Sequence, residues 1–197
     1  VTKLPIIEAM LTIPRERFVP ADLAEAAYIG ENIALGGGRV LLDPRTLAKM
    51  LDALDIKPSD LVLDLAPASG YSSAVIAHMA QAVVALEGDS SLADEAEAAL
   101  EAIGVTNVVL ERGAPEAGAA AHGPYDVVIV EGGIEVFPTV LVDQLKEGGR
   151  AAAIFMQGAL GTIRVGVKHG GVMRWRDAFN AAAPLLAGFT APREFAL

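Results

Sequence analysis

The stretch from Asp60 to Val75 says more about the fold of this chain than any other segment. An apolar run over residues 61–65, interrupted by Asp64, leads into the small residues of 66–70 and then into a helical pattern that opens at Tyr71. Glu87 directly follows the next apolar run. A buried strand, a tight turn, a helix and an acidic residue after the second strand are typical of α/β proteins that hold a nucleotide-like cofactor.

The rest of the chain beyond residue 60 alternates apolar runs with helical patterns. The runs predict strands at 61–65, 82–86, 107–110, 126–130 and 151–155, and the patterns between them predict helices at 71–79, 91–103 and 138–145. Ser90 and Ser91 are the expected caps of the second helix. Continuous apolar strands are covered on both faces, so the alternation predicts a doubly wound, mostly parallel α/β sheet.

Both ends of the chain depart from this alternation. Residues 2–11 and 20–28 predict short helices, residues 33–40 a glycine-rich loop, and Asp43-Pro44 the start of a helix that runs to about Leu54. Near the other end, alternating apolar residues on either side of a turn at 169–171 predict an antiparallel hairpin. A dinucleotide-binding half-domain would continue with a helix and a parallel strand, so the hairpin favours the methyltransferase variant of the fold.

Composition narrows the partners. A net charge of -10 argues against nucleic-acid binding, and the absence of cysteine excludes disulfides and thiolate chemistry. No apolar run reaches the roughly 18 to 20 residues of a membrane span. We see no signal peptide and expect a cytoplasmic protein with no membrane partner. The three histidines have no metal-binding spacing, so no metal is expected. The sequence leaves the oligomeric state open.

Five segments carry a resemblance to a known family: 13–20, 38–44, 62–71, 124–130 and 144–150. They resemble the protein-L-isoaspartate O-methyltransferases, which use S-adenosyl-L-methionine. The resemblance implies one class I methyltransferase domain over residues 1–197, with a seven-stranded sheet. Within it, residues 1–55 would form a helical segment over the acceptor site, and residues 60–197 the cofactor-binding core.

The resemblance also implies a set of site residues. The substrate side would be formed by Val40, Leu41 and Leu42. The cofactor would be held by Asp64, Ala66, Ala68, Ser69, Gly70, Tyr71, Glu87, Gly113 and Glu131. No catalytic residue is assigned, because a carboxylate nucleophile is already ionised at pH 7 and positioning supplies most of the catalysis.

Four departures from the family pattern bear on activity. Leu42 stands where the family has a serine, Gly88 where arginine is usual, and residues 112–116 replace a Gly-Asp-Gly segment. Ala66 and Ala68 replace glycines in the turn, where alanine at positive φ costs on the order of 1 kcal/mol. The turn therefore either still holds the cofactor or is an inherited turn that binds nothing.

The roles of three carboxylates also have alternatives. Glu87 is expected to accept the ribose hydroxyls, unless it faces solvent. Asp64 would either take the ammonium group of the cofactor or cap the loop backbone. Glu131 would either face water or point inward, where it would favour a neutral or cationic acceptor by repelling an isoaspartyl carboxylate.

The expected function is methyl transfer from S-adenosyl-L-methionine to L-isoaspartyl carboxyl groups in damaged proteins, a repair activity with a protein or peptide acceptor. One alternative is an impaired relative that binds a nucleoside-like ligand or a protein partner. Another is a methyltransferase with a different acceptor. A nicotinamide-dependent oxidoreductase is disfavoured by the incomplete Gly-x-Gly-x-x-Gly spacing and by the terminal hairpin.

Overall fold

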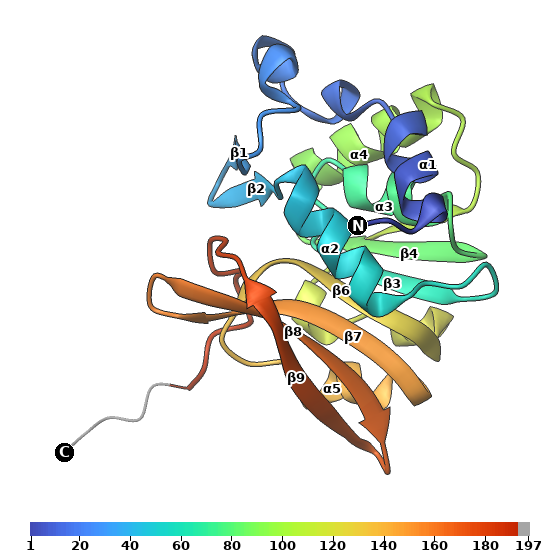
Figure 1. Cartoon of the computed structure of the whole chain (residues 1–197), viewed down its shortest axis with the longest axis vertical. Coiled ribbons are helices and arrows are strands. Elements are labelled where there is room, and N and C mark those ends of the chain that lie inside the picture. Colours follow the sequence, from blue (N-terminus) through green and yellow to red (C-terminus); the bar gives the residue numbers. More distant parts are fainter. Residues whose placement is uncertain (193–197) are drawn as a thin grey trace.

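A seven-stranded sheet forms the centre of the structure, a computed structural model that describes residues 1–192 (Figure 1). Its order is β5-β4-β3-β6-β7-β8-β9, parallel from β5 to β7 and antiparallel for β8 and β9. The strands are β3 (Leu61–Leu65), β4 (Ala82–Glu87), β5 (Val108–Arg112), β6 (Tyr125–Ile134), β7 (Leu145–Gln157), β8 (Leu160–His169) and β9 (Val172–Asn180). The predicted mostly parallel sheet with a C-terminal antiparallel hairpin is confirmed.

Helices cover both faces of this sheet. One face carries α1 (Leu4–Thr12), α2 (Pro44–Leu54), α3 (Tyr71–Ala77) and α4 (Ser90–Ala102), and the other carries α5 (Thr139–Asp143). Alternate strand residues divide between the two layers, with Val62 in the first core and Leu63 in the second. Strand side chains point to opposite faces in turn, so continuous apolar strands supply both cores. The doubly wound arrangement is confirmed.

Helix starts follow from carboxylate caps. Asp43 Oδ1 accepts hydrogen bonds from the amides of Arg45 and Thr46, and α2 begins at Pro44 as predicted. The cap of α4 is Asp89, whose Oδ1 accepts from the amides of Ser91 and Leu92. The prediction of a serine cap was wrong, because the carboxylate one position earlier satisfies the same free amides.

The N-terminal segment contains two strands in place of a predicted loop. Residues 33–40 form a hairpin of β1 (Ile33–Gly36) and β2 (Arg39–Leu41) rather than a loop. Gly36, Gly37 and Gly38 all have positive φ and close its turn. The predicted helix at 20–28 is a 3₁₀ helix over Ala21–Ala26, preceded by another over Arg15–Phe18. Strands of four and three residues are too short to show a periodic pattern.

Strand β6 continues beyond Val130, where we predicted its end. Gly132 and Gly133 lie inside the strand because the C-terminal segment pairs with it there: Gly133 donates to the carbonyl of Pro184 at 2.9 Å, and Leu186 donates to the carbonyl of Gly133 at 2.8 Å. A Cβ on Gly133 would lie 2.6 Å from the carbonyl oxygen of Ala183. Glycine thus permits this close approach, which covers the carboxyl end of the sheet.

Within residues 1–192, none of the helices combines the length and the apolar character that a membrane crossing requires.

Candidate functional site

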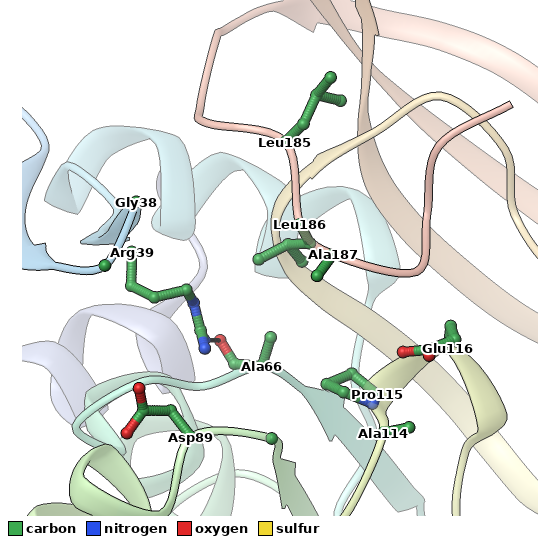
Figure 2. A pocket seen from close by; sticks show the side chains of 12 residues that line it. Gly38, Arg39, Ala66, Asp89, Ala114, Pro115, Glu116, Leu185, Leu186 and Ala187 are labelled. Atoms are coloured by element: carbon green, nitrogen blue, oxygen red, sulfur yellow. Dashed lines mark hydrogen bonds between the residues drawn. The ribbon is translucent and has the colours of Figure 1, made fainter.

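A cavity of about 470 Å³ lies at the carboxyl ends of β3, β4 and β5 (Figure 2). After β3 the chain continues into α3 on one face of the sheet, and after β6 it continues into α5 on the other face. Ligands of open α/β sheets bind beside such a switch point. The lining residues are Gly37, Gly38, Arg39, Ala66, Gly88, Asp89, Ala114, Pro115, Glu116, Leu185, Leu186 and Ala187. The β1–β2 hairpin and residues 185–187 therefore form walls of a cavity whose floor is the strand ends.

The turn after β3 has positive φ at two alanines, a backbone conformation that is strained for any residue with a Cβ. Ala66 has a φ of 58° and Ala68 a φ of 55°. The amide of Ala66 donates to the carbonyl of Leu86 at 2.9 Å, and the amide of Ala68 donates to Glu87 Oε2 at 2.8 Å. Only Ala66 of the two lines the cavity. The turn keeps the shape of a glycine-rich turn, but these amides bind internal partners.

Glu87 is fully buried, so the solvent-facing alternative is wrong. Arg39 Nη1 lies 2.6 Å from Glu87 Oε1, and Arg39 Nη2 lies 2.9 Å from Oε2. The same Nη2 donates to the carbonyl of Ala66 at 2.7 Å, and Figure 2 shows Arg39 reaching from the hairpin to that carbonyl. The expected ribose acceptor is thus held by an arginine from the N-terminal segment.

Asp64 is fully buried and does not cap the loop backbone. Its Oδ2 accepts hydrogen bonds from the hydroxyls of Ser72 and Ser73, both at 2.7 Å. Its Oδ1 has no hydrogen-bond partner among the described residues. Burial, opposed by the two serine bonds and reinforced by the charge of Glu87, raises the pKa of Asp64 to about 6. An unpaired buried acceptor is costly, so Oδ1 is suited to a cationic donor.

Glu131 is 6% exposed and faces the same layer as Asp64, so it does not point into water. Burial and the negative charge of Asp64 raise the pKa of Glu131 well above its usual value, while Arg15 opposes the rise. Glu131 Oε1 has no partner within residues 1–192. Burial therefore favours the neutral, protonated form of this carboxyl group.

Arg15 belongs to the N-terminal segment and is completely buried. Its Nε donates to the carbonyl of Ala27 at 2.6 Å, and its Nη2 donates to the carbonyl of Leu42 at 2.7 Å. Its Cζ lies 4.8 Å from the ring centroid of Tyr71. Two arginines from the first forty residues thus act on carboxylates of the sheet: Arg39 pairs with Glu87, and the charge of Arg15 acts on Glu131.

The other predicted cofactor residues pack rather than line the cavity. The hydroxyl of Ser69 donates to the carbonyl of Phe18, and the ring of Tyr71 packs edge-on against Phe18 at 5.6 Å. Gly70 has a φ of 90° and lies against Ala96 of α4. These contacts hold α3, α4 and the N-terminal segment together around the turn.

The segment that replaces Gly-Asp-Gly lies on the cavity wall. The amide of Gly113 donates to the carbonyl of Glu87 at 3.1 Å, and Ala114, Pro115 and Glu116 follow it along the lining. A Cβ on Gly88 would lie 3.2 Å from Pro115 Cδ, so Pro115 occupies the space that a side chain at position 88 would need.

The predicted substrate-side residues are mostly core. Leu41 and Leu42 are buried among the N-terminal helices, and Val40 is half-buried. The serine position of the family is therefore occupied by a packed leucine.

Four parts of the site were not predicted from the sequence: Arg15, Arg39, Asp89 and residues 185–187. A signal existed for Arg15 and Arg39, because both fall in segments of the family resemblance, at 13–20 and 38–44. The other contacts join segments far apart in the chain and leave no local pattern.

The family model for protein-L-isoaspartate(D-aspartate) O-methyltransferase matches residues 1–168. A protein-L-isoaspartate O-methyltransferase from Synechococcus is 38% identical over 144 residues, which cover 73% of this chain and 59% of that protein. A protein of the same name from Methanococcus aeolicus is 32% identical over 184 residues, which cover 92% of this chain and 85% of the relative. For a third relative of the same name, from Pelotomaculum thermopropionicum, the match covers 65% of the length of the relative. The chain therefore spans less than two thirds of some curated relatives.

The fold is shared with a solved structure from Plasmodium falciparum, described as a protein-L-isoaspartate O-methyltransferase in complex with S-adenosyl-L-homocysteine. The TM-score is 0.80 at 18% identity, and the match covers 94% of this chain and 91% of that one.

Proposed function

This chain belongs to the protein-L-isoaspartate O-methyltransferase family, and we propose that it transfers a methyl group from S-adenosyl-L-methionine to L-isoaspartyl carboxyl groups of damaged proteins or peptides. The observation that carries the proposal is the cavity at the ends of β3 and β4, lined by Ala66 of the turn after β3 and by Arg39, which pairs with the buried Glu87. Its volume lies within the 300 to 1,000 Å³ typical of ligand sites. Protein repair and a cytoplasmic location are parts of the same proposal.

Two carboxylates and one turn would hold the cofactor. Asp64 Oδ1, buried and unpaired, suits the ammonium group of the methionine part. Glu87, at the end of β4, suits the ribose hydroxyls, provided that Arg39 releases it. Ala66 and Gly88, which line the cavity, and the neighbouring Gly113 would complete the surroundings. Ala68 and Ser69 to Tyr71 would hold the turn in shape from behind.

For methyl transfer to a carboxylate, the main task of the protein is to orient the cofactor and the acceptor. S-adenosyl-L-methionine supplies an electrophilic methyl group, and an ionised carboxylate takes it by in-line displacement without a general base. The N-terminal segment, residues 1–55, would cover the acceptor and exclude water, with Val40, Leu41 and Leu42 forming its apolar base.

A protonated Glu131 is compatible with an anionic isoaspartyl acceptor. A charged Glu131 would repel an isoaspartyl carboxylate, but burial favours the neutral form. A neutral carboxyl group is a hydrogen-bond donor, so it orients an anionic acceptor instead of repelling it.

Two measurements test the proposal. Calorimetric titration with S-adenosyl-L-homocysteine should show one site, and labelled S-adenosyl-L-methionine should transfer its methyl to an isoaspartyl peptide but not to the matched aspartyl peptide. Binding of S-adenosyl-L-homocysteine without methyl incorporation into the peptide would point to another acceptor. No binding at millimolar S-adenosyl-L-homocysteine would refute the assignment of cofactor and activity.

A further inference from the structure

Glu87 has no acceptor capacity left while it is paired with Arg39. Its two oxygens accept two hydrogen bonds from Arg39, one from the amide of Ala68 at 2.8 Å and one from the amide of Asp89 at 2.9 Å. A carboxylate offers about four lone-pair sites. A ribose diol therefore binds Glu87 only after one of these donors has left.

The donor that is free to leave is Arg39. The amide of Ala68 belongs to a buried turn, and the amide of Asp89 belongs to the residue that caps α4. Arg39 instead begins a hairpin strand after Gly36, Gly37 and Gly38, around which no atom lies close enough to touch an added Cβ. Its side chain is 14% exposed. The arginine can thus withdraw without disturbing the sheet.

A displaced Arg39 needs an anion. Guanidinium stays charged at any relevant pH, and its planar donors match a carboxylate in two parallel bonds. Of the other carboxylates on the cavity wall, Asp89 caps α4 through its Oδ1, and the carboxyl group of Glu116 lies against Gly188. Arg39 also directly precedes the segment in which Leu42 replaces a hydroxyl residue.

We propose that Arg39 recognises the carboxylate of the methyl acceptor after the ribose hydroxyls of the cofactor have displaced it from Glu87. This inference rests on the proposed function. Arg39 then acts as a specificity-determining residue, because it supplies a hydrogen bond to the acceptor that the apolar side chain of Leu42 cannot form. Since the two events share one arginine, nucleoside and acceptor each raise the affinity for the other by the same factor.

The test compares Arg39→Gln with the native protein and with Arg164→Gln, which removes an equal charge from an ion pair with Asp177 on β8 and β9. Calorimetry measures binding of S-adenosyl-L-homocysteine alone, and then of an isoaspartyl peptide with and without it. We expect Arg39→Gln to bind the nucleoside about tenfold more tightly, since no competitor must leave. We also expect the nucleoside to tighten peptide binding at least fivefold in the native and Arg164→Gln proteins and not in Arg39→Gln.

Equal or weaker nucleoside binding by Arg39→Gln overturns the displacement, and unchanged coupling in that variant overturns the role in acceptor recognition. Should Arg39→Gln fail to fold by circular dichroism, Arg39→Lys must show the same two changes in smaller degree, because an ammonium group cannot form the bidentate pair. A native protein that shows the coupling but transfers no methyl refutes the proposed function, whereas the displacement of Arg39 and its binding of the peptide carboxylate still stand. Absence of nucleoside binding in every variant overturns both.

Discussion

Gly132 lies so close to Leu186 that a Cβ on Gly132 would stand 2.6 Å from the Cγ of that leucine. Leu186 and its neighbour Ala187 form one wall of the cavity, opposite the side chain of Ala66 (Figure 2). The missing side chain at Gly132 therefore sets the position of the wall.

Gly132→Ala should push this wall outward. We expect a loss of about 1 to 3 kcal/mol in the free energy of unfolding, as for other overpacked sites. Weaker binding of S-adenosyl-L-homocysteine should accompany it. Urea denaturation and calorimetry measure the two effects. Gly30→Ala is the control, because Gly30 is exposed and nothing lies within 4 Å of its added Cβ; equal effects from the two variants would contradict the role of Leu186.

The two alanines of the turn make a matched pair for separating strain from steric blockage. Ala66→Gly and Ala68→Gly each remove a residue from positive φ, which relieves on the order of 1 kcal/mol of strain and offsets the lost methyl burial. Of the two residues, only Ala66 lines the cavity. We expect near-unchanged stability in both and a severalfold gain in nucleoside affinity for Ala66→Gly alone. A similar gain in both variants would show that backbone strain, not the methyl group, limits binding.

Asp64 should make the native protein less stable as the pH rises. Its folded pKa of about 6 lies above the ordinary aspartate value of 3.8, so the folded state binds the proton more tightly than the unfolded chain does. The stability from the neutral carboxyl is present below about pH 4 and is lost as the pH rises to about 6, by up to about 3 kcal/mol. Asp64→Asn should lack this loss. Urea denaturation of both proteins at several pH values from about 4 to 7 isolates the difference, and parallel curves would refute the shift.

Arg15 should be a major source of stability for the N-terminal segment. Arg15→Met keeps much of the side-chain volume but removes the hydrogen bonds to the carbonyls of Ala27 and Leu42. We expect a loss of about 3 kcal/mol, because both carbonyls lose a charged donor. Arg17→Met, at an exposed position in the same 3₁₀ helix, should change the stability by less than about 0.5 kcal/mol. Thermal and urea denaturation compare the two; similar losses would mean that the buried bonds contribute little.

Local patterns were enough for most of the fold. The apolar runs at 61–65 and 82–86 match β3 and β4 to within one residue, since a strand buried on both faces has little choice of residue type. The hairpin of β1 and β2 was missed because it is too short to show alternation and its turn looks like a loop. The end of β6 was misplaced because glycines usually signal a break in a strand. Gly132 and Gly133 instead lie inside β6, where the lack of a side chain lets residues 184–186 pack directly against the strand.

By itself the sequence determined the mostly parallel sheet, the alternation of strands and helices along the chain, and the positions of Asp64 and Glu87 at or next to strand ends, because periodicity and small-residue turns are properties of neighbouring residues. Only the tertiary structure decided that Arg39 pairs with Glu87, 48 residues away in the chain, and that Arg15 lies buried where its charge acts on Glu131. Such pairings depend on how distant segments pack. Their energy comes from burial that no single segment encodes, so they become visible only when the chain is folded.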